Sequence, residues 1–283
     1  MFEGFRDERI DTGEAEVRVR HGGSGPPLLL LHGHPQTGAM WHRVAGSLAE
    51  RFTLVIPDLR GYGASSKPPT TPDHEPYSKR AMARDQVATM AALGFERFGV
   101  AGHDRGGRVA YRLAVLDIVP TGEAYRRADH RFGLIYWHWF FLPQPEPLPE
   151  RLIAADPEAI YFTGGREAFA AQALEEYWAA IADPETVHSM CEDYRAGATI
   201  DFELDEADLA AGRRIEAPLL AMWGARGALP VLYEDVEAIW RDWGNDVRGM
   251  EIDCGHYLPE EAPDEVASEL AAFFYQSGSR ERP

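Results

Sequence analysis

The sequence has few cysteines and no long apolar run. Its 283 residues include only two cysteines, Cys191 and Cys254, which are too few for a disulfide framework. We therefore expect reduced thiols and a cytoplasmic protein. No apolar run approaches the roughly 18 residues that a membrane-spanning helix requires. The first residues lack the basic and apolar regions of a secretory signal, so neither a membrane nor an exported protein is expected.

Positive charge is also scarce. The 46 acidic residues outnumber the 28 lysines and arginines, which gives a formal net charge of −18. A field of this sign argues against nucleic acid or an anionic membrane as partner, and mildly against an anionic substrate. Local arginines can still bind an anion, because exposed charges are screened over roughly 8–10 Å. The apolar share of 45% is ordinary for a globular protein with a large core.

Short strand-like segments alternate with helical patterns along most of the chain. Residues 14–20 alternate apolar and polar side chains, which predicts a half-buried antiparallel strand. Further strands, mostly continuous apolar runs, are expected at residues 28–31, 54–56, 97–101, 218–224 and 250–253. Helices are expected at residues 41–52, 81–93 and 264–274. This order predicts an α/β fold with a mostly parallel, doubly wound sheet.

The segment from residue 121 to residue 206 breaks this alternation. It is rich in aromatic residues at 136–141, then in prolines, and then in helical patterns at 168–181 and 184–192. We expect it to form a helical cap over the carboxyl edge of the sheet, where ligands bind in such folds. Residues 1–120 and 207–283 would then be the two parts of the core domain.

The five residues Gly102-His103-Asp104-Arg105-Gly106 carry most of the functional information. A small residue on each side of a nucleophile, between a strand and a helix, is the nucleophile elbow of the α/β-hydrolases. The central residue here is Asp104, and no Gly-x-Ser-x-Gly occurs in the chain. A carboxylate attacks saturated carbon and forms an ester, which favours dehalogenation or epoxide opening over esterase chemistry. The alternative is that Asp104 serves only as a helix N-cap.

Two further motifs fit the elbow. His32-Gly33-His34-Pro35 follows an early strand, and the main-chain N–H groups of His34 and Arg105 are the predicted oxyanion hole. His256 follows the last strand and is the predicted general base. General-base catalysis typically raises the rate by roughly 10²–10⁴-fold. The loop at residues 223–230 has no carboxylate, so Asp117 is the remaining candidate for the acid that orients His256.

With these residues in view, the chain resembles the fluoroacetate dehalogenases, the haloacetate branch of the α/β-hydrolases. The resemblance extends over nearly the whole length and implies an α/β-hydrolase fold with a helical cap. The matching segments are His32-Gly33-His34-Pro35-Gln36-Thr37, Asp58-Leu59-Arg60-Gly61-Tyr62-Gly63, Gly102-His103-Asp104-Arg105-Gly106-Gly107-Arg108, Val115-Leu116-Asp117, Met190-Cys191-Glu192-Asp193-Tyr194-Arg195 and Gly255-His256.

The resemblance also implies a reaction. In that family an aspartate displaces halide from a 2-haloacid, and a His–Asp pair then drives hydrolysis of the ester without a metal or an organic cofactor. It implies that Arg105 and Arg108 hold the substrate carboxylate, and that the protein is a homodimer. It further implies hydrogen bonds to the departing halide from His138, Trp139 and Tyr194. A planar guanidinium suits a carboxylate because it can donate two parallel hydrogen bonds.

The connection between Asp104 and Asp117 departs from the family pattern. The two residues are only 13 positions apart, whereas adjacent parallel strands need a crossover of about a dozen or more residues besides the returning strand. A helix over residues 105–116 would end about 18 Å from the elbow, at roughly 1.5 Å per residue. The helix must therefore be very short, or the return strand is largely missing, or the chain carries an internal deletion. In the last two cases contact between Asp117 and His256 is not assured and the sheet would lose a central strand. Natural folds rarely tolerate such a loss, which favours a deletion.

These observations predict a haloacetate dehalogenase and leave two alternatives. An epoxide hydrolase uses the same nucleophile with cap tyrosines, of which the motifs identify only Tyr194. Epoxide hydrolases often have an aromatic residue directly after the nucleophile, whereas Arg105 suits an anionic substrate. A relative that binds small carboxylates without turnover is supported only by the short connection between Asp104 and Asp117.

Overall fold

The described residues form one eight-stranded sheet, in the order β1-β2-β4-β3-β5-β6-β7-β8. The computed structural model describes residues 1–110, 114–161 and 166–280. β1 and β2 are antiparallel to their neighbours, and the remaining strands run parallel, as predicted. The strands are β1 (Arg6–Asp11), β2 (Glu16–Gly23), β3 (Pro27–Leu31), β4 (Thr53–Pro57), β5 (Gly99–His103), β6 (Ala114–Leu116), β7 (Leu219–Gly224) and β8 (Val247–Ile252).

Burial follows the sequence pattern that predicted the strands. In β2, Val17 and Val19 are fully buried and alternate with more exposed residues. In β3, all four leucines are at most 1% exposed, because the strand is central and covered on both faces. β1 was not predicted, since its sequence is highly charged and it pairs as an edge strand.

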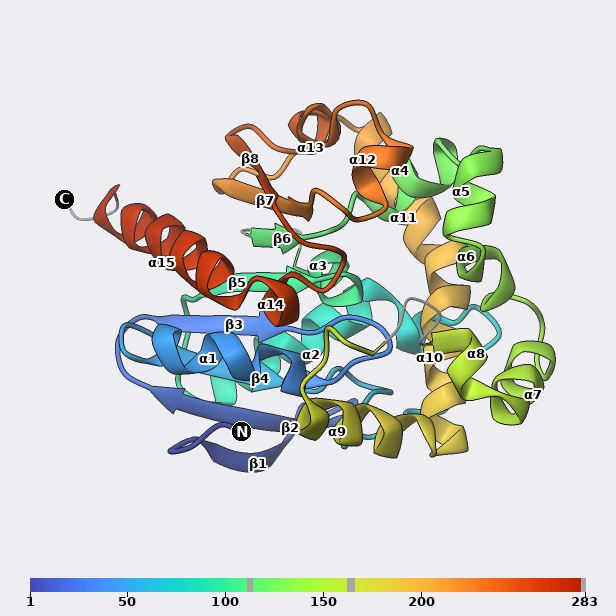
Figure 1. Cartoon of the computed structure of the whole chain (residues 1–283), viewed down its shortest axis with the longest axis horizontal. Coiled ribbons are helices and arrows are strands. Elements are labelled where there is room, and N and C mark those ends of the chain that lie inside the picture. The colour runs from blue at the N-terminus through green and yellow to red at the C-terminus, as the bar shows by residue number, and fades with distance from the viewer. Residues whose placement is uncertain (111–113, 162–165, 281–283) are drawn as a thin grey trace.

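Helices cover both faces of the sheet. Figure 1 shows α1 and α15 in front of the strands and α2 behind them. The helices of the core are η1 (Gly38–Trp41), α1 (His42–Ala49), η2 (Glu75–Tyr77), α2 (Lys79–Ala92), α3 (Arg105–Val109), α12 (Leu229–Leu232), α13 (Val236–Trp243), α14 (Leu258–Glu261) and α15 (Pro263–Arg280). None of the described helices is both long and apolar enough to span a membrane.

Among the described residues between β6 and β7, in the segment predicted to be the cap, there are eight helices and no strand. Figure 1 shows most of them on the right, beyond the carboxyl ends of the strands. They are α4 (Thr121–Arg126), α5 (His130–Ile135), α6 (His138–Phe141), α7 (Leu148–Ala155), α8 (Pro157–Tyr161), α9 (Ala171–Ile181), α10 (Pro184–Ala198) and α11 (Ile200–Ala210). The predicted domain boundary at residue 206 falls inside α11, and the division into domains stays a prediction.

The short connection after the elbow is accommodated by a short helix and a short strand. α3 has five residues and β6 has three, or about 7–8 Å and 10 Å at ordinary rises per residue. The expected helix extended over residues 111–113, which lie outside the described residues. β6 still pairs with both β5 and β7, so the sheet keeps its central strand.

The register of β5 and β6 brings the two acidic residues together. His103 pairs with Leu116, so Asp104 and Asp117, the next residue of each strand, stand side by side at the carboxyl edge. The Asp104 N–H donates to the Leu116 carbonyl at 3.1 Å. Of the three alternatives for the short connection, a missing return strand is excluded, because β6 is short but present and α3 is only five residues long.

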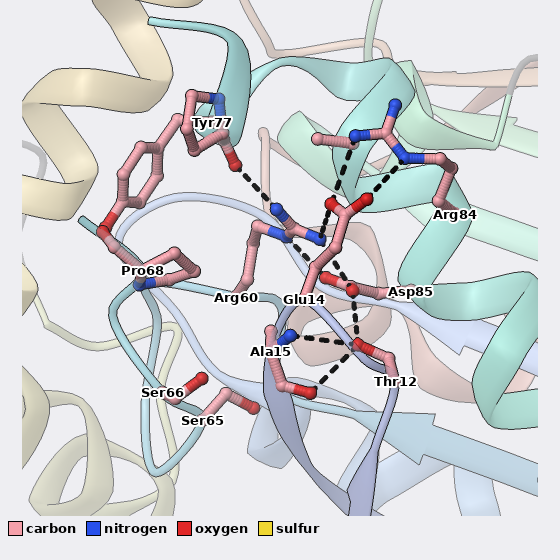
Figure 2. A network of polar contacts seen from close by, with 12 residues as sticks. Thr12, Glu14, Ala15, Arg60, Ser65, Ser66, Pro68, Tyr77, Arg84 and Asp85 are labelled. Atoms are coloured by element: carbon pink, nitrogen blue, oxygen red, sulfur yellow. Dashed lines mark hydrogen bonds and ion pairs between the residues drawn. The ribbon is translucent and has the colours of Figure 1, made fainter. Parts of the chain in front are cut away.

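A buried arginine fixes the loop that follows β4. Arg60 is 1% exposed, and its Nε and Nη2 donate to both oxygens of Asp85 on α2 at 2.5 and 2.6 Å. Figure 2 shows the same guanidinium donating to Glu14, while Thr12 donates to Asp85. The network joins the β1–β2 turn, α2 and the loop at residues 58–63. That loop carries Tyr62, which reaches the cap as described below.

Candidate active site

The predicted nucleophile, Asp104, lies at a sharp turn between β5 and α3. Its φ of 45° is in the left-handed region, which L-residues rarely adopt. A Cβ on Gly102 would come within 2.3 Å of the Gly106 carbonyl oxygen, and one on Gly106 within 2.4 Å of the His32 oxygen. Both flanking positions therefore require glycine, as the predicted elbow does. Asp104 is 8% exposed.

One oxygen of Asp104 is held by the loop after β3. The main-chain N–H of His34 donates to Oδ2 of Asp104 at 2.9 Å. This close approach requires Gly33, where a Cβ would lie 2.7 Å from the Asp104 Cβ. His34 is thus placed as a donor to the nucleophile, while the predicted donor role of the Arg105 N–H stays a prediction.

His256 and Asp117 meet at the same edge of the sheet. Nδ1 of His256 lies 2.6 Å from Oδ2 of Asp117, whose Oδ1 accepts the Gly224 N–H at 2.9 Å. Burial lowers the pKa of His256, but the hydrogen bond and charge of Asp117, with the charge of Asp104, raise it above its ordinary value. The pair is therefore arranged to stabilise a protonated imidazole.

Two side chains that were not predicted hold the loop around His256. Glu261 accepts the Gly255 N–H at 2.7 Å and the Tyr257 N–H at 3.0 Å, on either side of the histidine. Nε2 of His103 lies 2.8 Å from the His256 carbonyl oxygen. Burial lowers the pKa of His103 to about 3, so this ring is neutral and its Nε2–H donates to the carbonyl.

The charges around Asp104 keep it ionised. Burial alone would raise the pKa of this carboxyl group. The His256 ring and the guanidinium groups of Arg105 and Arg108 outweigh burial and hold the pKa of Asp104 below its ordinary range. The carboxylate is therefore in the nucleophilic form at neutral pH.

The two predicted carboxylate-binding arginines lie on α3, but their side chains have different partners. Arg108 lines the cavity described below, donates from Nη1 to the Val119 carbonyl, and lies over the Trp139 ring at 4.6 Å from its centroid. Its Nε is buried without a partner among the described residues. Arg105 is not among the residues that line the cavity, and it donates from Nε and Nη2 to the carboxylate of Asp193 at 2.9 and 2.7 Å. Its predicted role as a ligand of the substrate carboxylate stays a prediction.

The three predicted halide donors come together in the cap. His138 and Trp139 begin α6, and their ring centroids lie 5.8 and 6.2 Å from that of Tyr194 on α10. All three line the cavity with Asp104. Burial lowers the pKa of His138 to about 4, so this imidazole is neutral and presents one N–H. Burial raises the pKa of Tyr194, which therefore keeps its O–H donor.

These groups surround one cavity of about 220 Å³ between the sheet edge and the cap. Tyr161 at the end of α8 also lines it, and its hydroxyl is buried without a partner among the described residues. The lining residues are His34, Pro35, Asp104, Arg108, Asp117, Ile135, Tyr136, Trp137, His138, Trp139, Leu142, Ile160, Tyr161, Tyr194, His256 and Tyr257. Most of the lining side chains are thus aromatic, and most of these also carry a polar atom.

The sequence motifs did not identify Glu261, Asp193 or Tyr161 as site residues. Glu261 lies five residues after His256, and this spacing could have indicated a carboxylate that caps the histidine loop. Asp193 directly precedes Tyr194 inside a matching segment, but its contact with Arg105 spans 88 positions. Tyr161 lies outside all of the matching segments.

The described residues contain no cluster of histidine, cysteine, aspartate or glutamate side chains that could hold a metal ion. The polar groups of the cavity are instead two carboxylates, a guanidinium, imidazoles, indoles and phenols. These groups can carry out nucleophilic and acid–base chemistry with their own atoms.

Comparison with known proteins agrees with this geometry. Residues 26–120 match the family model described as the alpha/beta hydrolase fold. A fluoroacetate dehalogenase from Burkholderia sp. is 44% identical, over 99% of this chain and 97% of that protein. The chain belongs to the fluoroacetate dehalogenase family of α/β-hydrolases. That alignment is 297 positions long, 14 more than the 283 residues here, so at least 14 of its positions have no counterpart in this chain.

Other members of the wider fold are also similar. A Nostoc sp. protein, whose crystal structure is described as that of an α/β-hydrolase, superposes with a TM-score of 0.93. It is 47% identical, over 97% of this chain and 99% of that one. A soluble epoxide hydrolase from Corynebacterium sp. is 32% identical, over 89% of this chain and 91% of that protein. The fluoroacetate dehalogenase family thus has epoxide hydrolases among its relatives.

Proposed function

We propose that the protein hydrolyses haloacetates to glycolate and halide through a covalent ester on Asp104. The observation that carries the proposal is a single cavity with an ionised aspartate, an arginine and three neutral aromatic hydrogen-bond donors. The arginine, Arg108, supplies the positive charge that a small carboxylate needs in a protein with a net charge of −18. Membership of the fluoroacetate dehalogenase family supports the same reaction.

In the first step, Oδ1 of Asp104 attacks the carbon that carries the halogen. A carbon–oxygen bond forms as the carbon–halogen bond breaks, and the halide leaves with the bonding electron pair. His138, Trp139 and Tyr194 would donate hydrogen bonds to the halide as its charge develops. Fluoride is a poor leaving group, so these donors must supply much of the stabilisation of the transition state.

In the second step, His256 takes a proton from a water molecule that attacks Cγ of the Asp104 ester. Oδ2 of Asp104 becomes the oxyanion of the tetrahedral intermediate, and the His34 N–H, 2.9 Å away in the free enzyme, stabilises it. The bond between Cγ and the substrate oxygen then breaks, and the protonated His256 returns a proton to the glycolate that leaves. Asp104, left as the carboxylic acid, releases the other proton of the water to solvent and becomes a carboxylate again. Asp117 stabilises the imidazolium between these events.

The Asp117–His256 contact removes the support for a non-catalytic carboxylate binder. That alternative depended on a connection too short for Asp117 to reach His256, and the two side chains lie 2.6 Å apart.

Epoxide hydrolysis is the second candidate, and one observation favours it. Tyr161 joins Tyr194 on the cavity wall, and its hydroxyl has no partner among the described residues. Two phenols could polarise an epoxide oxygen while Asp104 attacks the ring carbon. Arg108 in the same cavity favours an acid substrate over a neutral epoxide. Turnover of styrene oxide with a kcat/KM above that of chloroacetate would make this second candidate the main activity.

We further propose that the protein acts in the cytoplasm as a homodimer. Both cysteines are free and buried, as expected in a reducing compartment. The dimer follows from the family resemblance alone. Light scattering after size-exclusion chromatography would measure the mass in solution, and a monomer at micromolar concentration would contradict it.

Halide release from fluoroacetate and chloroacetate tests the proposed function. The wild-type protein should release halide and glycolate in equal amounts over many turnovers. Asp104→Ala should lose at least about 10⁴-fold in rate, because no other group in the cavity replaces the nucleophile. Circular dichroism would establish that the variant is folded. Wild-type protein that is folded and releases no halide from either acid would contradict the proposal.

A further inference from the structure

Asp193 stands out among the buried groups that the proposed reaction does not use. It lies on α10, is 0% exposed, and accepts hydrogen bonds from side chains of three different segments. Arg105 donates twice, Tyr62 donates at 2.7 Å, and the ammonium of Lys79 contacts Oδ1. Burial raises the pKa of Asp193, but Arg105 and Lys79 outweigh it and hold the pKa below its usual range.

We propose that Asp193 is a positioning residue that holds Arg105 so that one edge of its guanidinium is left for the substrate carboxylate. This inference rests on the proposed function, since it names the group that sets substrate binding in that reaction. Neither Asp193 nor Arg105 is among the residues that line the cavity, but the Arg105 guanidinium packs against two that are, Trp139 at 5.9 Å and Tyr194 at 4.2 Å from the ring centroids. Asp193 therefore acts through Arg105, whose free edge must reach the cavity beside these rings.

The donors of Arg105 can be counted. Nε donates to Oδ2 of Asp193 at 2.9 Å, and Nη2 donates to Oδ1 and to the Asp193 carbonyl, both at 2.7 Å. These bonds use one N–H of Nε and both of Nη2. Nη1 has no hydrogen bond with any described residue, and it retains two N–H donors for an anion.

The Arg105 guanidinium is held by an aromatic ring against its face as well as by the hydrogen bonds of Asp193 along its edge. Its central carbon lies 4.2 Å from the centroid of the Tyr194 ring, within the range of a cation–π contact. A Cβ added to Gly197 on the same helix would lie 3.0 Å from Nη2. α10 therefore surrounds Arg105 with a carboxylate, an aromatic ring and a glycine, and leaves the group little freedom to rotate.

Two residues of the core domain, Tyr62 and Lys79, hold Asp193 in turn. Tyr62 lies in the loop at residues 58–63, which Arg60 and Asp85 fix in the network of Figure 2. Lys79 begins α2, and its ammonium also faces Asp201 at 3.4 Å. Arg105 and Lys79 thus face two carboxylates, Asp193 and Asp201, and the four charges balance. Arg105 would therefore hold an anion through the two free N–H groups of Nη1 rather than through an excess of positive charge.

Adjacent residues of α10 thus serve the two ends of the substrate. Asp193 sets the arginine predicted to bind the carboxylate, and Tyr194 is a predicted donor to the halide. A carboxylate fixed by Arg105 and Arg108 would place the halogen-bearing carbon in front of Asp104. Loss of Asp193 should therefore weaken substrate binding more than it slows the bound substrate.

The test compares Asp193→Asn with Asp201→Asn. Both changes remove a buried carboxylate that contacts Lys79, but only Asp193 contacts Arg105. The readouts are kcat and KM for chloroacetate, and the dissociation constant of acetate, which has the carboxylate and no leaving group. In Asp193→Asn we expect KM and the acetate constant to rise together by about 10-fold, with kcat changed by less than about threefold. Asp201→Asn should leave both binding constants within about twofold.

Tyr62→Phe is the second variant, and it decides the matter if Asp193→Asn does not fold. It removes one hydrogen bond to Asp193 and keeps every charge, so KM and the acetate constant should rise about two- to fivefold with kcat unchanged. Unchanged acetate binding in a folded Asp193→Asn protein would overturn the inference, as would a fall in kcat alone. If only Tyr62→Phe folds, unchanged acetate binding there would overturn it too. Failure of the proposed function looks different, since wild-type protein would then release no halide while the acetate comparison could still be made.

Discussion

The two sides of the cavity are built by different means. On the sheet side, the main chain sets the reacting groups: Asp104 by the elbow and the His34 N–H, and Asp117 by strand register and the Gly224 N–H. On the cap side, side chains contact the two arginines of α3 that we propose bind the substrate, as Asp193 does with Arg105 and the ring of Trp139 does with Arg108. We expect substitutions on the sheet side to stop the chemistry, and those on the cap side to change binding and the choice of leaving group.

The largest effect that tests this comparison is expected for His256→Gln. The nucleophile remains, so the first step should proceed once, while hydrolysis of the ester should slow by roughly 10²–10⁴-fold. Chloroacetate should release one halide per active site in a burst, and intact-protein mass should rise by one carboxymethyl group. A variant with neither burst nor adduct would contradict the separation of the two steps. Asp104→Ala, which should give no burst, is the control.

Asp117→Asn should have the next largest effect, with a change in pH dependence. The general base must be neutral, and Asp117 raises the pKa of His256, so wild-type activity should increase with pH through a value above 6.5. Removing the charge should lower that pKa, move the acid limb to lower pH, and reduce kcat by roughly 10²-fold. The matched control is Asp253→Asn, at a carboxylate 86% exposed. An unchanged acid limb in the Asp117 variant would contradict the pairing of Asp117 with His256.

On the cap side, Tyr194→Phe should change the choice of halide. Fluoride needs hydrogen-bond donors more than chloride does, so kcat/KM should fall about 10-fold further for fluoroacetate than for chloroacetate. Tyr233→Phe is the control, because Tyr233 is buried but does not line the cavity. An equal fall in kcat/KM for fluoroacetate and chloroacetate would contradict a hydrogen bond from Tyr194 to the halide.

The smallest effect is expected for Glu261→Ala. Gly255 and Tyr257 would lose the acceptor of their N–H groups, and His256 between them would be less well placed. Ester hydrolysis should slow by about three- to tenfold, the size of a hydrogen bond or two. Glu265→Ala, at an exposed glutamate on α15, should change nothing. A Glu261 variant with wild-type kcat would show that the loop holds its form without the carboxylate.

The same contrast explains what the sequence could predict. Strands, the elbow and the histidine loop follow from local patterns, because apolar runs, glycines and strand ends dictate the backbone there. The connection between Asp104 and Asp117 could be recognised as unusually short. Whether the sheet kept the strand before Asp117 could not be predicted, because this depended on how few residues α3 and β6 each use. A binding role for Arg105 could be predicted from the family resemblance, and it stays a prediction. Its pairing with Asp193 could not, since that contact joins α3 to a cap helix 88 positions away.

The central claim is that Asp104 forms an ester that water cleaves at Cγ, and a single turnover in ¹⁸O-labelled water tests it most directly. With enzyme in excess over chloroacetate, the water oxygen should enter the Asp104 carboxylate, and the glycolate hydroxyl should carry an unlabelled oxygen from the enzyme. Mass spectrometry of the peptide that contains Asp104 and of the glycolate would locate the label. Label in the first-turnover glycolate, with an unlabelled Asp104, would mean that water attacks the substrate directly and would contradict the account.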